Sequence, residues 1–309
     1  MPAARYRGRF APTPSGALHL GSLVAALGSC LEARVQDGEW LLRIEDVDAP
    51  RVVAGAAEDI LRTLEAFGFE WDGPVWYQSR RSEAYAEALA RLARDGLVYA
   101  CSCSRSQIRA VARRGVDGPV YPGSCRARAD RPSRAAWRLR LPDERVVFTD
   151  ALFGRVSCEL ARECGDFVLR RADGVYSYQL AVVVDDAAQG VTHVVRGADL
   201  LASTPRQIVL QRLLALPTPQ YLHLPVVLDA RGDKLSKQTL AAPVDAHAPL
   251  PALLAAWRFL GQSEPGRIDT VAEFWAMARA LWDRRRIPPL RGRRMPAAGL
   301  SAGSLRAPA

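Results

Sequence analysis

The segment Arg9–Ser22 reads RFAPTPSGALHLGS and joins an apolar strand to an apolar helix. We expect the strand at Tyr6–Phe10 and the helix between Leu20 and Val35, where apolar residues recur at helical spacing. The loop between them lies at the start of the helix, where free backbone N–H groups and the helix dipole favour phosphate. His19 and Gly21 stand at this point, so the segment predicts an α/β fold with a phosphate site.

A second strand and a second helix continue the same pattern. Trp40–Ile44 is an apolar stretch that ends in the acidic cluster Glu45–Asp48, and a helix is expected after Pro50. Further strands are expected at Val191–Val195 and Tyr221–Leu228, with a helix between them. Strands that alternate with helices predict a parallel, Rossmann-like sheet.

The middle of the chain departs from this pattern. From Cys101 to Arg134 it is rich in Cys, Arg, Gly and Pro, and strand-like segments follow, with a hairpin through Asp173 and Gly174 to Val175–Tyr178. This predicts an inserted α+β subdomain with antiparallel strands. We therefore expect five parts. The Rossmann-like domain has a first half (1–98) and a second half (176–242), which ends in a lysine loop around Lys234 and Lys237, and the inserted subdomain (99–175) lies between the halves. A helical segment (243–289) and a disordered basic tail (290–309) follow.

The composition predicts a soluble protein with an anionic partner. The formal net charge of +9 and the pI of about 9.6 favour nucleic acid over a membrane surface. The N-terminus lacks a signal-peptide core, and no apolar run approaches the ~18 residues of a membrane span. We expect a cytoplasmic monomer. Six cysteines in 309 residues are too few for a disulfide scaffold.

The chain has 42 basic residues, of which only Lys234 and Lys237 are lysines. A lysine is a compact charge on a flexible stem, whereas arginine is a rigid planar fork. Two lysines in one short loop are consistent with a solvated turn after Gly232, or with a mobile loop that holds a triphosphate during a reaction.

The opening segment and the lysine loop together resemble the HIGH and KMSKS signatures of class I aminoacyl-tRNA synthetases. RIEDVD at 43–48 and THVVRGAD at 192–199 are similar to the glutamyl-tRNA synthetase group, and the likeness extends from about residue 5 to residue 240. Ser22 stands where the HIGH signature has its second histidine. The resemblance implies His19, Lys234 and Lys237 as catalytic residues, and His19, Gly21 and Lys237 as ATP-binding residues, with Mg²⁺ as a companion of ATP.

The resemblance also implies a glutamate site, and the chemistry of the residues agrees with it. Glutamate has one ammonium and two carboxylates, so its pocket needs guanidinium groups and an acid. Arg9, Glu45 and Arg196 each stand at the end of an expected strand and would face one edge of the sheet. The residues that the family pattern carries over to glutamate binding are Arg9, Phe10, Ala11, Pro12, Thr13, Glu45, Tyr178 and Arg196.

Fewer than seventy residues follow the lysine loop, where full-length members of this group continue with an anticodon-binding domain. In this respect the sequence is similar to the short paralogues, the glutamyl-Q tRNA(Asp) synthetases. The resemblance implies that glutamate is activated with ATP, without tRNA, to glutamyl-adenylate and is then attached to queuosine of tRNA(Asp). The sequence offers no obvious general base for that transfer. The alternatives are another acceptor, a ligase for a small molecule with the same phosphate loop, and a non-catalytic tRNA-binding paralogue.

Three cysteines gather in the inserted segment, at Cys101, Cys103 and Cys125. Three thiolates in a segment without apolar periodicity fit one structural Zn²⁺, although three reduced thiols without metal would share the pattern. No histidine lies in the segment, so the residues alone leave water or Asp117 as the fourth ligand. The family resemblance implies Tyr121 instead.

Overall fold

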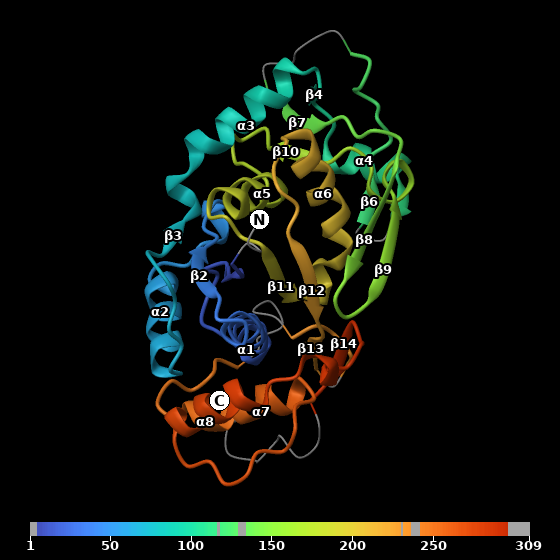
Figure 1. Cartoon of the computed structure of the whole chain (residues 1–309). Helices are drawn as coiled ribbons and strands as arrows, with labels where there is room; N and C mark the ends of the chain where they lie inside the picture. The colour runs from blue at the N-terminus through green and yellow to red at the C-terminus, as the bar shows by residue number, and fades with distance from the viewer. Residues whose placement is uncertain (1–4, 116–117, 129–133, 230, 236–241, 296–309) are drawn as a thin grey trace.

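The computed structural model describes residues 5–115, 118–128, 134–229, 231–235 and 242–295. Two groups of strands form its central layer (Figure 1). The first group is parallel and consists of β1 (Arg7–Phe10), β2 (Glu39–Ile44) and β3 (Trp76–Tyr77). The second runs in the order β11 (His193–Gly197), β12 (Gln220–Leu224), β8 (Arg145–Asp150) and β9 (Gly154–Glu159). The groups meet where the N–H of Thr192 donates to the carbonyl oxygen of Arg7 at 2.9 Å.

Helices cover both faces of this layer, as expected for alternating strands and helices. One apolar core lies between β1, β2, α1 (Leu20–Arg34) and the C-terminal helices, and it contains the fully buried Trp40 and Trp257. A second core lies under α3 (Ser82–Arg94), α5 (Tyr178–Ala188) and α6 (Thr204–Leu213) and contains Tyr85 and Leu180. The remaining helices are α2 (Ala56–Ala66), α4 (Arg105–Val111), α7 (Pro249–Phe259) and α8 (Val271–Leu281). Within the described residues, no helix has the length and apolarity needed to span a bilayer.

The inserted segment forms its own antiparallel strands. A sheet in the order β10 (Val168–Arg170), β7 (Ala136–Leu139) and β4 (Val98–Cys101) stands beside the small hairpin of β5 (Arg113–Gly115) and β6 (Gly118–Val120). The strands β8 and β9 behave differently, because β8 pairs in parallel with β12 through Tyr221 and Asp150. The β8–β9 hairpin therefore extends the sheet of β11 and β12, although its residues were expected in the insertion.

Three expected element boundaries were wrong. The helix expected after Pro50 starts at Ala56, because residues 49–51 form a 3₁₀ turn and Gly55, with φ of +76°, precedes the helix. The strand expected at Tyr221–Leu228 is divided by Pro225, which has no N–H to donate to a neighbouring strand, into β12 and β13 (Val226–Leu228). Tyr178 opens α5 instead of ending a hairpin strand, because the Ser177 hydroxyl caps this helix.

The basic tail begins with regular structure. The strand β14 (Gly292–Arg294) pairs in parallel with β13. The close approach of the two strands fits a glycine at position 292, because an added Cβ would lie 2.9 Å from the Leu228 side chain. The expectation of disorder from residue 290 was therefore wrong for this strand. The rest of the expected tail, residues 296–309, lies outside the described residues.

Candidate active site

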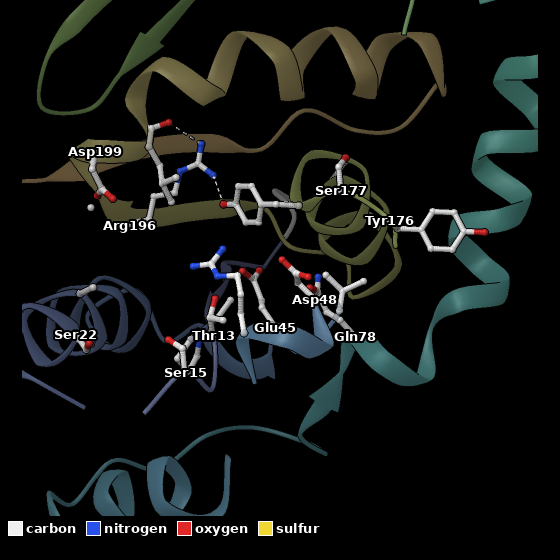
Figure 2. Close-up of a pocket in the computed structure, with 18 of the residues that line it drawn as sticks. Thr13, Ser15, Ser22, Glu45, Asp48, Gln78, Tyr176, Ser177, Arg196 and Asp199 are labelled. Atoms are coloured by element: carbon white, nitrogen blue, oxygen red, sulfur yellow. Dashed lines mark hydrogen bonds between the residues drawn. The ribbon is translucent and has the colours of Figure 1, made fainter. Parts of the chain in front are cut away.

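A cavity of about 1510 Å³ opens at the carboxyl ends of β1, β2 and β11. In the described part of the chain, eight Arg or Lys side chains and four Asp or Glu side chains line it, which favours anionic ligands. Figure 2 shows Arg196 and Asp199 on one wall and Thr13, Ser15 and Glu45 on the opposite wall. The predicted substrate and catalytic residues that line it are Arg9, Phe10, Ala11, Pro12, Thr13, His19, Gly21, Glu45, Tyr178, Arg196 and Lys234.

The loop after β1 places His19 at the N-terminus of α1. His19 is the N-cap residue, and its Nδ1 accepts a hydrogen bond from the backbone N–H of Ser22 at 3.3 Å. Because Nδ1 accepts, a neutral imidazole carries its proton on Nε2. The ring can thus present an N–H donor at the same helix end where backbone N–H groups favour an anion.

Gly21 allows a close approach between α1 and the lysine loop. A Cβ at this position would lie 3.0 Å from His19 Cε1 and 3.7 Å from the carbonyl oxygen of Leu235. Leu235 is held in turn against β13, because its N–H donates to the carbonyl oxygen of Val227 at 2.8 Å. A Cβ at Gly21 would therefore crowd the imidazole, which would have to shift by a few tenths of an ångström.

The lysine loop reaches the cavity through Lys234. Its Nζ lies 2.5 Å from Oδ2 of Asp199, and both side chains are partly exposed. Asp199 follows the end of β11, so this ion pair joins the loop to the strand that carries Arg196. Lys237, the second predicted lysine, lies outside the described residues.

A buried network of charges lies beneath the cavity on the side of β1 and β2. Oδ1 of Asp186 accepts from Arg9 Nε at 3.1 Å and contacts Arg43 Nη2 at 2.8 Å. Arg43 also contacts Glu45 Oε1 at 3.4 Å and donates to Gln189 Oε1 at 2.7 Å. Arg43 is fully buried, and only 3% of Arg9 is exposed. Asp186 therefore holds both guanidinium groups in place, and water has almost no access to either of them.

The two carboxylates of this network have opposite pKa shifts. Burial raises the pKa of Glu45 above its usual value, despite the opposing charges of Arg43 and Arg9. Burial also opposes ionisation of Asp186, but Arg9 and Arg43 outweigh it and lower the pKa of this carboxyl. Asp186 is thus a stable anion, whereas Glu45 would be stabilised as an anion by an additional cation in the cavity.

Arg196 lies on the opposite wall, near the end of β11. Its Nη1 donates to Tyr178 Oη at 3.3 Å and its Nη2 donates to Thr204 Oγ1 at 2.8 Å. Because the phenol oxygen accepts from Arg196, its own proton remains available as a donor. Tyr178 and Arg196 therefore place two donor groups side by side, an arrangement that suits a carboxylate.

The predicted metal ligands lie together in the inserted segment. The Sγ atoms of Cys101, Cys103 and Cys125 all lie within 4.8 Å of one another. Tyr121 Oη lies 3.3 Å from Cys101 Sγ and 3.6 Å from Cys103 Sγ, and it accepts from the backbone N–H of Cys125 at 3.0 Å. Hydrogen bonds from Tyr121 and Cys103 outweigh burial and lower the pKa of Cys125 to about 7. Asp117, the alternative from the sequence, lies outside the described residues.

The sequence did not reveal three buried polar residues around the cavity, Arg43, Asp186 and His223. Arg43 stood inside the quoted RIEDVD motif without a role. The signal for Asp186 was the pair Asp185–Asp186 in an otherwise apolar helix, because charged residues are rarely buried without partners. His223 carried no local signal, since its partners lie far away in the sequence.

The comparisons with known proteins agree on one family. The family described as "tRNA synthetases class I (E and Q), catalytic domain" matches residues 5–249. A protein named glutamyl-Q tRNA(Asp) synthetase from Dechloromonas aromatica (strain RCB) is 57% identical over 289 residues, which cover 92% of this chain and 96% of the relative. A protein of the same name from Neisseria meningitidis serogroup C (strain 053442) is 54% identical over 287 residues, covering 92% of this chain and 97% of the relative.

Solved structures share the fold at much lower identity. A glutamate tRNA ligase from Elizabethkingia meningosepticum CCUG26117, crystallised with its amino acid, superposes with a TM-score of 0.78 at 24% identity. The match covers 96% of this chain and 68% of that one. At this identity the likeness establishes the class I synthetase catalytic fold.

Proposed function

The chain belongs to the class I tRNA synthetases of the E and Q catalytic-domain family, and from this premise we propose that it activates glutamate with ATP and transfers it to queuosine of tRNA(Asp). It is an enzyme, a ligase of the aminoacyl-tRNA synthetase type. The observation that carries the proposal is the shared cavity, which holds the His19 helix end, Lys234 and the pair Arg196–Tyr178 facing Glu45.

The walls of the cavity match the charges of glutamate. Arg196 and Tyr178 present neighbouring donors to one carboxylate, and Arg9 lies across the cavity beside Glu45. The ammonium group of the substrate would pair with Glu45 and supply the cation that favours its ionised form. We propose that the loop Phe10–Thr13 completes this site through its backbone.

The nucleotide would occupy the side of the cavity formed by α1 and the lysine loop. The phosphates would lie at the N-terminus of α1, within reach of the His19 Nε2–H, with Gly21 beneath them. The substrate carboxylate attacks the α-phosphorus of ATP, the bond to the bridging oxygen breaks, and pyrophosphate leaves with glutamyl-adenylate remaining. Lys234 and Lys237, together with Mg²⁺ bound to the phosphates, would neutralise the charge on the departing group.

The acceptor is proposed from the relatives and from the available space. Relatives that match nearly the whole chain are named for tRNA(Asp) and for the glutamyl-Q product. The cavity volume of about 1510 Å³ exceeds the roughly 300–1,000 Å³ of typical small-molecule pockets, which leaves room for a nucleoside beside the adenylate. In the second step a hydroxyl of the cyclopentene-diol attacks the activated carbonyl, and AMP leaves.

We propose that the cysteine cluster holds one structural zinc ion. Sulfur atoms bound to one tetrahedral zinc at ~2.3 Å lie ~3.8 Å apart, and Cys103 and Cys125 are already 3.5 Å apart. The Tyr121 oxygen lies beside the same sulfur atoms and would be the fourth ligand. The zinc ion would stabilise the fold of the inserted segment and take no part in the reaction.

Metal analysis should find about one zinc per chain. Cys103→Ser should lower that content, whereas Cys158→Ser, outside the cluster, should leave it intact. If the wild-type protein freed of metal is as stable as the untreated protein, the assignment is contradicted.

Pyrophosphate exchange tests the activation step. With labelled pyrophosphate, ATP and glutamate, the purified enzyme should form labelled ATP in the absence of tRNA. Arg196→Gln should abolish the glutamate-dependent exchange. Arg258→Gln, which removes an exposed ion pair to Glu264, should retain this exchange. Exchange that requires tRNA, or no exchange with any amino acid, would refute the proposal.

A further inference from the structure

Behind Arg196 lies a line of buried polar groups for which the proposed reaction has no role. Arg196 Nε donates to His223 Nε2 at 3.1 Å, and His223 Nδ1 lies 2.7 Å from Asp150 Oδ2. His223 is fully buried, and only 1% of Asp150 is exposed. The three residues come from β11, β12 and the end of β8, which are neighbouring strands of one sheet.

The directions of these hydrogen bonds determine the tautomer of His223. Arginine N–H groups only donate, so His223 Nε2 must carry a lone pair. The imidazole proton then resides on Nδ1 and is donated to Asp150. Asp150 is held in place, because its Oδ1 accepts from the backbone N–H groups of Leu152 and Phe153, both at 3.0 Å.

The surroundings keep the imidazole neutral. Burial lowers the pKa of His223 to about 4, although hydrogen bonding to Asp150 opposes this shift. The charged groups that act on the ring are Asp150, Arg196 and, more weakly, Asp199. Thr204 Oγ1 also contacts Nε2 at 3.2 Å and adds no charge. A neutral ring with a fixed tautomer is therefore the stable form at neutral pH.

This arrangement distinguishes Arg196 from Arg9, the buried arginine across the cavity. Within the described residues, its hydrogen-bond partners are the neutral groups His223 Nε2, Thr204 Oγ1, the Leu200 carbonyl and Tyr178 Oη. Arg9, by contrast, is paired directly with a carboxylate, that of Asp186. Neutral acceptors fix the guanidinium without cancelling its charge, so the charge remains to attract a substrate carboxylate.

We propose that His223, fixed in one tautomer by Asp150, is a positioning residue that aims Arg196 at the substrate carboxylate. The inference rests on the proposed glutamate-binding role of Arg196. A purely structural alternative exists, since the His223 ring also stacks on Tyr221 with centroids 6.0 Å apart. The two roles differ in what a substitution changes: positioning affects one substrate, whereas packing affects stability and every substrate alike.

Two substitutions of His223 separate these roles. In His223→Gln the side-chain amide oxygen can still accept from Arg196 Nε, whereas His223→Leu offers no acceptor. In the exchange assay, His223→Leu should raise the KM for glutamate roughly 10- to 100-fold, the range expected for one lost hydrogen bond to a charged group. The KM for ATP should change by less than about 2-fold, and His223→Gln should recover most of the loss.

Val194→Ala is the matched control for stability. Val194 lies in the same strand as Arg196, and 1% of it is exposed, but its side chain makes no hydrogen bond. It should lower the melting temperature without a selective change in the KM for glutamate. Equal changes in both KM values for His223→Leu, or the same selective change in Val194→Ala, would overturn the proposal.

The ¹⁵N spectrum of the imidazole groups tests the geometry without any substrate. The chain has four histidines, and His223→Gln identifies the signals of His223 by their loss. We expect a neutral ring at pH 6 with the proton on Nδ1; a proton on Nε2 would overturn the proposal. If the wild type fails to activate glutamate, the proposed function fails, whereas this spectrum still decides whether His223 accepts from Arg196.

Discussion

Asp186→Asn should destabilise the protein strongly, because it removes the anion shared by two buried arginines. Asp186 lies 3.1 Å from Arg9 Nε and 2.8 Å from Arg43 Nη2, and Arg43 has no access to solvent. Without this carboxylate, Arg43 keeps its contact with Glu45, which lies farther away, at 3.4 Å, and a more distant interaction with Asp185. Removing one partner of a buried ion pair costs about 3–5 kcal/mol, so we expect a loss of this size in the free energy of unfolding at pH 7.

Urea denaturation at pH 7 measures this loss, and its pH dependence provides a second check. The folded state lowers the pKa of Asp186, so its contribution is fully present above the unfolded value of about 3.9. It is lost as the pH falls through the lower folded-state pKa, and the difference between wild type and variant should shrink there. Asp269→Asn, which removes an exposed ion pair with Arg267, should stay within about 0.5 kcal/mol of the wild type. A loss below about 1 kcal/mol for Asp186→Asn would refute the reasoning.

Three further predictions concern single residues. Gly21→Ala should reduce kcat/KM for ATP roughly 10- to 100-fold, because the added Cβ would lie 3.0 Å from His19 Cε1. Gly266→Ala, whose added Cβ would have no other atom within 4 Å, should leave kcat/KM unchanged in the same assay. Lys237→Arg should keep the melting temperature yet lose most of the pyrophosphate exchange, since the charge survives but the flexible point-like ammonium does not; normal exchange would contradict the role given to this lysine. His223 should contribute a loss of about 3 kcal/mol to the stability of the wild type between pH 6.5 and about pH 4, because only the unfolded state protonates this residue in that range. Urea titrations at several pH values should show a dependence shallower by this contribution for His223→Gln.

The parts of the fold that the sequence predicted correctly depend on local patterns. The helix α1 and the strands β1, β2 and β11 were expected from apolar periodicity, within one or two residues of their observed bounds. Parallel strands point their carboxyl ends to one edge, so the position of Arg9, Glu45 and Arg196 around one cavity followed from the strand assignments.

The parts that the sequence did not predict depend on distant partners. Asp186 contacts Arg9, which is 177 positions away in the sequence, and His223 contacts Asp150, which is 73 positions away. A local sequence pattern therefore cannot predict either contact. The strand β14 was missed for the same reason, because an arginine-rich segment has little strand propensity of its own and pairs only with β13. Tertiary contacts decide such elements, and they become visible only in the structure.

We propose that the loop with His19, the lysine loop and the predicted glutamate-binding residues form one active site around the cavity. The product of the complete reaction tests this most directly. Labelled glutamate, ATP and purified enzyme should be incubated with tRNA(Asp) that carries queuosine and with the same tRNA carrying unmodified guanosine at that position. We predict an ester-linked label on the queuosine-containing tRNA alone, lost upon periodate oxidation of the cyclopentene-diol before the reaction. Equal labelling of both tRNAs, or labelling at the 3′ end of the tRNA, would contradict the account.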